Sequence, residues 1–310
     1  MRALVTGAGG FVGNHLCAAL RARGDEIRMA DRGGVGDVYP LDLGDPRALR
    51  AMIERAEPAA IYHLAGQASV KDSFADPTAT FDVNARGTAL LLDAARSVRD
   101  AGGPATRIVV VSSADVYGAR APDAYPLRET LAVAPASPYA ASKAAAEAVA
   151  QAYHHAYGLD VIIVRAFNHI GPGQSERFAI ASFAGQLARI ARGGKPLLLT
   201  GDLSVRRDFL DVRDVAAAYI ALAGGGRSGE IYNVASGRAV PLREVLRLLI
   251  EAAHVPVEVR EDENRMRAAD APVVFGDATK LREETGWSPS IPLAVTLRET
   301  YRAALEAIAP

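Results

Sequence analysis

Tyr139 and Lys143 are the residues whose types and spacing most directly suggest chemistry. If the segment is helical, two residues four apart lie on one face, one turn from each other. A free tyrosine titrates near about 10, and a fixed positive charge beside the phenol lowers its pKa. The pair therefore suggests a proton-transfer device, although a surface tyrosine with a solvated lysine would have the same pattern.

The segment that carries this pair is predicted to be a helix with a defined start. Ser137 supplies a capping hydroxyl, and Pro138 has the backbone angle that suits the first helical position. Small residues recur along the helix and would let another helix approach closely, either within the subunit or in a homodimer. They are Ala141, Ala144, Ala145, Ala148 and Ala152.

A glycine-rich turn lies at the start of the chain. An apolar run at 3–6 ends in Gly7, and Gly10 and Gly13 follow before an amphipathic stretch. Strand, glycine turn and helix together form the context in which a dinucleotide pyrophosphate binds a helix N-terminus. The turn therefore predicts a site for NAD(H) or NADP(H).

The next strand, at 26–30, ends in residues that could select between these two cofactors. Asp31 could accept hydrogen bonds from the adenosine ribose, which favours NAD, whereas Arg32 could bind a 2′-phosphate, which favours NADP. Asp42 and Leu43 fall where an adenine ring would lie if 38–45 contains the third strand, and an ordinary turn would have the same composition. The sequence leaves both choices open.

Further strands are expected at 59–65, 107–113 and 161–167, with helices at 46–57 and 77–98. Ser113 ends a strand that contains three consecutive valines. Because ligands bind beyond the carboxyl ends of parallel strands, its hydroxyl could donate to a substrate carbonyl; alternatively it caps a turn. His63 is expected to be a hydrogen-bonded histidine at a strand end, not a base.

This alternation predicts an α/β protein with a Rossmann-like, doubly wound parallel sheet and a smaller, discontinuous C-terminal substrate-binding domain. The NAD(P)-binding domain is expected at 1–167, with segments near 207–235 returning to it. The nucleotide-sugar-binding domain is expected at 168–310.

Composition narrows the range of functions. A formal net charge of −1 argues against a nucleic-acid or anionic-membrane binder. Cys17 is the single cysteine, which excludes an internal disulfide framework and fits a reducing compartment. The sequence shows no signal peptide, no apolar run of about 18 residues and no metal-ligand spacing. A cytoplasmic protein without a metal is therefore expected.

Taken together, these features resemble the extended short-chain dehydrogenases/reductases over essentially the full chain. The matching motifs are Thr-Gly-x-x-Gly-x-x-Gly at 6–13, Asp42-Leu-Gly-Asp45, His63-Leu-Ala65, Ser113 before Val-Tyr-Gly, and Tyr139-x-x-x-Lys143. Within that family the chain is similar to GDP-4-dehydro-6-deoxy-D-mannose reductases. That similarity is carried by Phe167-Asn-His-Ile-Gly-Pro-Gly-Gln174, Arg207-Asp-Phe-Leu-Asp-Val212 and Arg265-Met-Arg-Ala-Ala-Asp270.

The resemblance implies NAD(P)H-dependent reduction of the C4 keto group of GDP-4-dehydro-6-deoxy-D-mannose to GDP-D-rhamnose by a homodimer. Tyr139 would protonate O4, Ser113 would bond the same oxygen, and Lys143 would lower the phenol pKa and hold the nicotinamide ribose. The implied cofactor contacts are Gly7, Gly10, Phe11, Val12, Gly13, Asp31, Arg32, Asp42, Leu43, Leu64, Ala65, Tyr139 and Lys143. The implied substrate contacts are Ser73, Ser113, Asn168, Arg207, Arg267 and Asp270, the last standing where a glutamate is more usual.

Three other activities remain open from the sequence. A 4,6-dehydratase of the same family would need a carboxylate base, and Asp115 is one methylene shorter than the glutamate expected there, while Ala114 cannot act as an acid. A nucleotide-sugar 4-epimerase would use the same serine, tyrosine and lysine. A non-catalytic cofactor-binding protein would commonly lack the tyrosine or the lysine.

Overall fold

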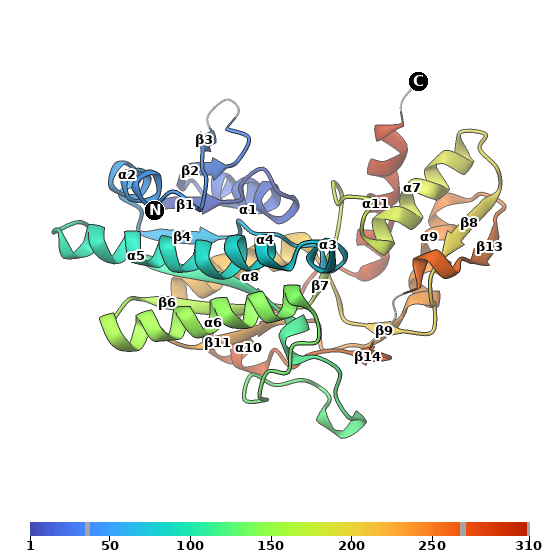
Figure 1. Ribbon diagram of the computed structural model, residues 1–310. Coiled ribbons are helices and arrows are strands. Elements are labelled where there is room, and N and C mark those ends of the chain that lie inside the picture. Colours follow the sequence, from blue (N-terminus) through green and yellow to red (C-terminus); the bar gives the residue numbers. More distant parts are fainter. Residues whose placement is uncertain (35–37, 267–270, 309–310) are drawn as a thin grey trace.

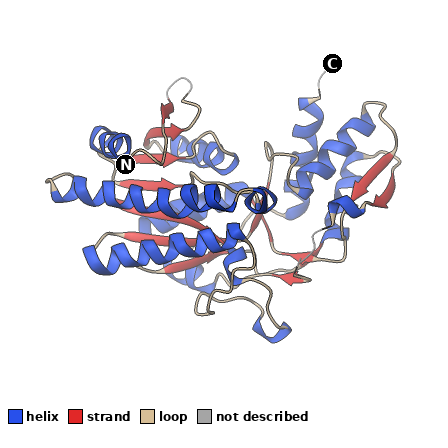
Figure 2. Ribbon diagram, in the orientation of Figure 1, coloured by secondary structure: helices blue, strands red, loops and turns tan. Residues whose placement is uncertain are grey.

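A seven-stranded parallel sheet lies at the centre of the larger lobe of the protein (Figure 1; Figure 2). The computed structural model describes residues 1–34, 38–266 and 271–308. The strand order is β11-β6-β5-β4-β1-β2-β3, and every neighbouring pair is parallel. The strands are β1 (Arg2–Thr6), β2 (Glu26–Asp31), β3 (Val38–Pro40), β4 (Ala60–His63), β5 (Arg107–Ser113), β6 (Val161–Ala166) and β11 (Ile231–Val234).

Helices cover both faces of this sheet (Figure 1). Leu16 and Val215 belong to the apolar layer on one face, and Leu91 and Ala150 to the layer on the other. Burial from both sides explains why β5 and β6 are nearly continuous apolar runs. The Rossmann-like fold class is therefore confirmed. The covering helices are α1 (Phe11–Ala22), α8 (Val212–Gly225) and α10 (Thr279–Thr285) on one face, and α2 (Pro46–Ala56), α5 (Gly87–Asp100) and α6 (Pro138–Tyr157) on the other.

The strand order reverses between β1 and β4, whose last residues Thr6 and His63 pair in register. Connections after these two strands lead to opposite faces of the sheet, and such a switch point opens a crevice at the carboxyl ends. The glycine turn follows β1 and the 64–69 segment follows β4, so both lie at this crevice.

The helix expected at 77–98 is interrupted. α4 (Pro77–Phe81) continues into a π-helical turn, η1 (Asp82–Arg86), before α5 begins at Gly87. α4 packs near α3 (Val70–Ala75), which precedes it in the chain. A π-helical turn inserts one residue into the helical register and often marks a functional position.

A smaller lobe packs around its own apolar cluster, which contains Leu187, Leu246 and Leu297 (Figure 1). Its helices are α7 (Ala179–Ala191), α9 (Leu242–Ala253) and α11 (Leu293–Ala307). The short strands pair as β7 (Asn168–Ile170) with β10 (Phe209–Asp211), β8 (Leu197–Thr200) with β13 (Glu258–Glu261), and β9 (Arg206–Arg207) with both β12 (Val240–Pro241) and β14 (Val273–Val274). Short helices are η2 (Ala114–Tyr117), η3 (Pro122–Ala124) and η4 (Glu263–Arg265).

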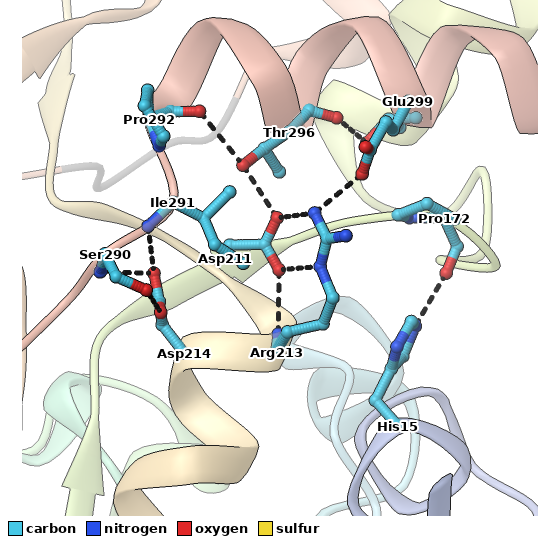
Figure 3. Close-up of polar contacts among 11 residues, drawn as sticks. His15, Pro172, Asp211, Arg213, Asp214, Ser290, Ile291, Pro292, Thr296 and Glu299 are labelled. Carbon is cyan, nitrogen blue, oxygen red and sulfur yellow. Dashed lines mark hydrogen bonds and ion pairs between the residues drawn. The ribbon is translucent and has the colours of Figure 1, made fainter. Parts of the chain in front are cut away.

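Polar contacts at the start of α8 tie the two lobes together (Figure 3). The Asp211 carboxylate caps α8 and accepts a 2.8 Å hydrogen bond from the Thr296 hydroxyl of α11. Asp214 accepts from the backbone amides of Ser290 and Ile291, which lead into α11. α8 itself packs on the large sheet, so the base of α11 is held from the first lobe.

No helix among the described residues is long and apolar enough to cross a membrane.

Candidate active site

The glycine turn has the shape that a dinucleotide pyrophosphate requires. Gly7 adopts φ +73°, and a β-carbon there would lie 2.7 Å from the Ala65 amide nitrogen. A β-carbon on Gly13 would lie 2.2 Å from the Gly7 carbonyl oxygen, so α1 packs against the turn itself. Gly10 is the N-cap of α1 and offers no capping side chain. The first amides of α1 are therefore left without a side-chain cap, and a phosphate fits there.

Asp31 braces this turn from the end of β2. Its Oδ2 accepts a 2.8 Å hydrogen bond from the Gly9 amide, and its Oδ1 accepts one from the Arg32 amide. The Arg32 side chain is exposed. Gly9 was not among the predicted site residues, and its place in the site becomes apparent only from the tertiary contact with Asp31.

The residues expected around the adenine ring differ in exposure. Asp42 is exposed, and its carboxylate accepts from the Gly44 amide at 2.8 Å. Leu43 is only 8% exposed and packs towards Gly87 of α5. The Leu43 side chain is therefore part of the core in the described structure, while Asp42 both stabilises a turn and faces solvent.

The other expected cofactor contacts flank the crevice. Phe11 stacks on His169 with ring centroids 6.1 Å apart, and Val12 packs on the core beneath the sheet. Leu64 and Ala65 are half-buried at the end of β4. Phe11 thus joins the glycine turn to β7 of the smaller lobe.

Ser113, Tyr139 and Lys143 are brought together by the packing of α6 on β5. Ser137 caps α6 through a 3.1 Å bond from the Ala140 amide, which confirms the predicted helix start. Tyr139 is 8% exposed and interacts with the Ser113 hydroxyl, while Lys143 Nζ donates to the Val111 carbonyl at 2.9 Å. The Ser113 hydroxyl also accepts from an amide of η2, so it caps a turn as well as facing the phenol.

Burial has the largest effect on the pKa values of Tyr139 and Lys143. Burial, followed by the charge of Asp115, raises the pKa of the Tyr139 phenol, and hydrogen bonding with Ser113 lowers it. Burial lowers the pKa of Lys143 to about 8, against the charge of Glu147, which raises it. The sequence predicted a lowered tyrosine pKa; the structure has a raised pKa, because desolvation and the Asp115 charge outweigh the hydrogen bond with Ser113. At neutral pH the phenol is therefore protonated and can donate.

His63 is a hydrogen-bonded core histidine, as expected. It is 3% exposed, and its two ring nitrogens contact the hydroxyls of Thr6 at 2.9 Å and Thr88 at 3.1 Å. Burial and the charge of Lys143 lower its pKa to about 3. His63 is therefore neutral at physiological pH.

The π-helical turn places Asn84 beside the crevice, a position that sequence periodicity did not reveal. Asn84 Oδ1 accepts from the Gln67 amide at 2.8 Å, and Asn84 Nδ2 donates to the Ser142 hydroxyl at 2.9 Å. A β-carbon on Gly66 would lie 2.8 Å from Asn84 Oδ1 and 3.5 Å from Lys143 Nζ. Asn84 therefore links the segment after β4 to α6 next to the lysine.

The expected substrate contacts are spread over both lobes. Ser73 is fully buried in α3, where its hydroxyl donates to the Val70 carbonyl at 2.7 Å, so it does not reach a surface in the described structure. Asn168 is exposed on β7, and Arg207 is half-buried on β9. Arg267 and Asp270 lie outside the described residues.

Known proteins match this chain over nearly its full length. Residues 4–300 match the family described as GDP-mannose 4,6 dehydratase. The GDP-6-deoxy-D-mannose reductase of Pseudomonas aeruginosa is 41% identical over 305 residues, which cover 98% of this chain and 96% of that protein. The UDP-glucose 4-epimerase of Mycolicibacterium smegmatis is 32% identical over 317 residues, covering 97% of each.

A solved structure matches equally well. The structure of RMD from Pseudomonas aeruginosa complexed with NADPH superposes with a TM-score of 0.90 and 38% identity, covering 99% of this chain and 100% of that one. The chain belongs to the GDP-mannose 4,6-dehydratase family and has the fold of the extended short-chain dehydrogenases/reductases.

Proposed function

We propose that this protein reduces the C4 keto group of GDP-4-dehydro-6-deoxy-D-mannose to give GDP-D-rhamnose, using NADPH or NADH. The observation that carries the proposal is the buried Tyr139 phenol, which contacts Ser113 and stays protonated at neutral pH. A reduction consumes a proton at the new hydroxyl, so a protonated acid is what this step needs. The similarity to a GDP-6-deoxy-D-mannose reductase supports the same substrate class.

In this mechanism each side chain of the group has a separate task. The nicotinamide cofactor supplies the hydride when it is bound. The Ser113 hydroxyl donates to O4 of the keto sugar and orients it, and Tyr139 delivers the proton to that oxygen. Lys143 carries a positive charge beside the phenol and binds the nicotinamide ribose. Burial of Tyr139 keeps bulk water from competing for the carbonyl oxygen.

For the cofactor, the site favours NADPH. Both Asp31 oxygens already accept backbone amides, so part of the acceptor capacity that would read an unmodified ribose is in use. Arg32 is exposed beside them and can bind a 2′-phosphate through a bidentate contact. The relative solved with NADPH agrees with this preference.

We assign the nucleotide sugar to the smaller lobe, where Asn168 is exposed on β7 and Arg207 is half-buried on β9. Arg267 and Asp270 remain predictions from the sequence. A homodimer is supported by the alanine stripe of α6, because none of its five members is buried within its own chain. They are Ala141, Ala144, Ala145, Ala148 and Ala152.

A 4-epimerase is the second candidate, because it would use the same three side chains and a similar epimerase matches the full chain. A dehydratase is less well supported, since Ala114 cannot act as an acid and Asp115, whose charge acts on Tyr139, is one methylene shorter than the glutamate expected as the base. An epimerase recycles its cofactor, whereas a reductase consumes reduced cofactor in proportion to product.

The test is oxidation of NADPH and NADH by the purified protein in the presence of GDP-4-dehydro-6-deoxy-D-mannose, with the product sugar identified. Stoichiometric oxidation that yields GDP-D-rhamnose is expected. Tyr139→Phe should lower kcat by about 10²- to 10⁴-fold, the usual contribution of a general acid. Tyr153→Phe, on the same helix, is the matched control and should keep wild-type turnover. Equal turnover by Tyr139→Phe would show that another group donates the proton.

A further inference from the structure

A buried ion pair lies one helical turn beyond Lys143. Glu147 of α6 and Arg165 of β6 are each 4% exposed at the side chain. Arg165 Nη2 donates to Glu147 Oε2 at 2.7 Å, and Arg165 Nε donates to Oε1 at 3.0 Å. The hydroxyl of Ser112 also donates to Oε1, at 2.5 Å. The carboxylate therefore has a charged partner and a hydroxyl partner, which hold it in place.

Glu147 is one of three α6 residues that contact the end of β5. Lys143 bonds the carbonyl of Val111, Glu147 bonds the side chain of Ser112, and Tyr139 faces Ser113. Three consecutive strand residues thus meet three helical residues spaced one turn apart. Two of these contacts involve proposed catalytic residues, and the third involves Glu147.

The surroundings of Lys143 explain why a negative charge is needed there. Tyr139, one turn earlier on α6, is protonated and neutral, and His63 of β4 is neutral. The ammonium donates to the uncharged Val111 carbonyl of β5. Burying a lysine favours its neutral form, so without an opposing charge the ammonium would lose its proton near neutral pH.

The groups that contact Glu147 come from two strands, and Lys143 lies one turn away on its own helix. Arg165 approaches from β6, Ser112 from β5 and Lys143 from its own helix. Arg165 is held in turn by the Tyr117 ring, 4.7 Å from its guanidinium carbon, and by the Glu129 carbonyl. Glu147 lies one turn after Lys143 on α6, the two side chains bond the adjacent β5 residues Ser112 and Val111, and the charge of Glu147 raises the pKa of Lys143.

We propose that Glu147 is a positioning residue that keeps the Lys143 ammonium charged inside the buried site, while Ser112 and Arg165 hold its carboxylate in place. The catalytic consequence rests on the proposed function of Lys143. The charge relation between the two residues does not, and it can be measured without turnover.

The experiment uses the small number of lysines in the chain. There are four, Lys71, Lys143, Lys195 and Lys280, so labelling their ε-carbons gives a simple NMR spectrum, and Lys143→Arg identifies the Lys143 signal. In the wild-type protein the Lys143 signal should titrate with a pKa near 8. Glu147→Gln should move this midpoint down by about one pH unit or more, since two charges one turn apart couple by that order. Glu147→Asp keeps the charge and should restore most of the shift.

Two further variants separate this role from a structural one. If Glu147→Gln does not fold because Arg165 is left unpaired, the double variant Glu147→Gln/Arg165→Met removes both charges and should still lower the Lys143 midpoint. Asp160→Asn breaks the Arg107–Asp160 ion pair at the other end of the same strands and should leave that midpoint unchanged.

Turnover supplies the second readout. In the folded Glu147→Gln variant, the basic limb of the kcat/KM profile should move to lower pH together with the NMR midpoint. An unchanged Lys143 midpoint in both the single and the double variant would overturn the proposal, as would an equal shift in Asp160→Asn. A shifted midpoint in a protein that reduces no keto sugar would uphold this relation and refute the proposed function.

Discussion

Gly13→Ala tests whether the glycine turn binds the dinucleotide as its geometry indicates. The new β-carbon would lie 2.2 Å from the Gly7 carbonyl oxygen and 2.8 Å from both the Cα and the carbonyl oxygen of Ala8. Favourable contacts lie at about 3.5–4.0 Å, so the turn or the start of α1 must move by roughly 1 Å. All three atoms belong to the backbone, and no side chain can rotate away.

The size of the expected loss in stability and in NADPH affinity follows from this overpacking. Overpacking of this kind destabilises a protein by about 1–3 kcal/mol. Because the same displacement moves the first amides of α1 away from the pyrophosphate position, a similar loss is expected in NADPH affinity. That loss corresponds to a Kd raised roughly 5- to 150-fold.

Fluorescence titration with NADPH measures the affinity, and urea unfolding followed by circular dichroism measures the stability. The matched control is Gly224→Ala in the last turn of α8, where a β-carbon meets nothing within 4 Å. This control should leave NADPH affinity unchanged and raise stability by about 0.5–1 kcal/mol, because alanine suits a helix better than glycine. If Gly13→Ala binds NADPH within about twofold of wild type, the assignment of this turn to the pyrophosphate is refuted.

Two other changes test the cofactor preference and the assembly. Arg32→Ala should raise the KM for NADPH by about 10-fold or more and leave that for NADH nearly unchanged, since a charged hydrogen bond to phosphate contributes about 1.5–3 kcal/mol; equal effects on both cofactors would contradict the 2′-phosphate role. Ala148→Glu places a charge on the exposed part of the α6 stripe and should convert a dimer to monomers in light scattering, whereas Glu54→Ala on the exposed face of α2 serves as the control; a wild-type monomer would refute the dimer.

Much of the site could be read from local sequence, because local rules determine it. Gly7 has a positive φ and Gly13 lies against the Gly7 carbonyl, and both of these requirements lie within the same short segment. Ser137 starts α6, so the four-residue spacing of Tyr139 and Lys143 places both on one face. The alternation of apolar runs and amphipathic stretches likewise specified a parallel sheet covered by helices.

The tertiary structure decided what lies around these residues. The π-helical turn at Asn84 carries no clear periodic signal, and it is the contact with Gln67 and Ser142 that gives it a place in the site. The lobe junction at Asp211 and Thr296 joins residues far apart in the sequence.

The same distinction governs the electrostatics. The sequence by itself determined that a tyrosine and a lysine share a helix face, but burial reversed the expected direction of the tyrosine pKa. In the sequence, Glu147 has no feature that distinguishes it from other helical carboxylates. Its contacts with Ser112 of β5 and Arg165 of β6 are visible only in the tertiary structure. The reason is physical: spacing along a helix is a local property, whereas desolvation and charge pairing depend on which strands pack against that helix.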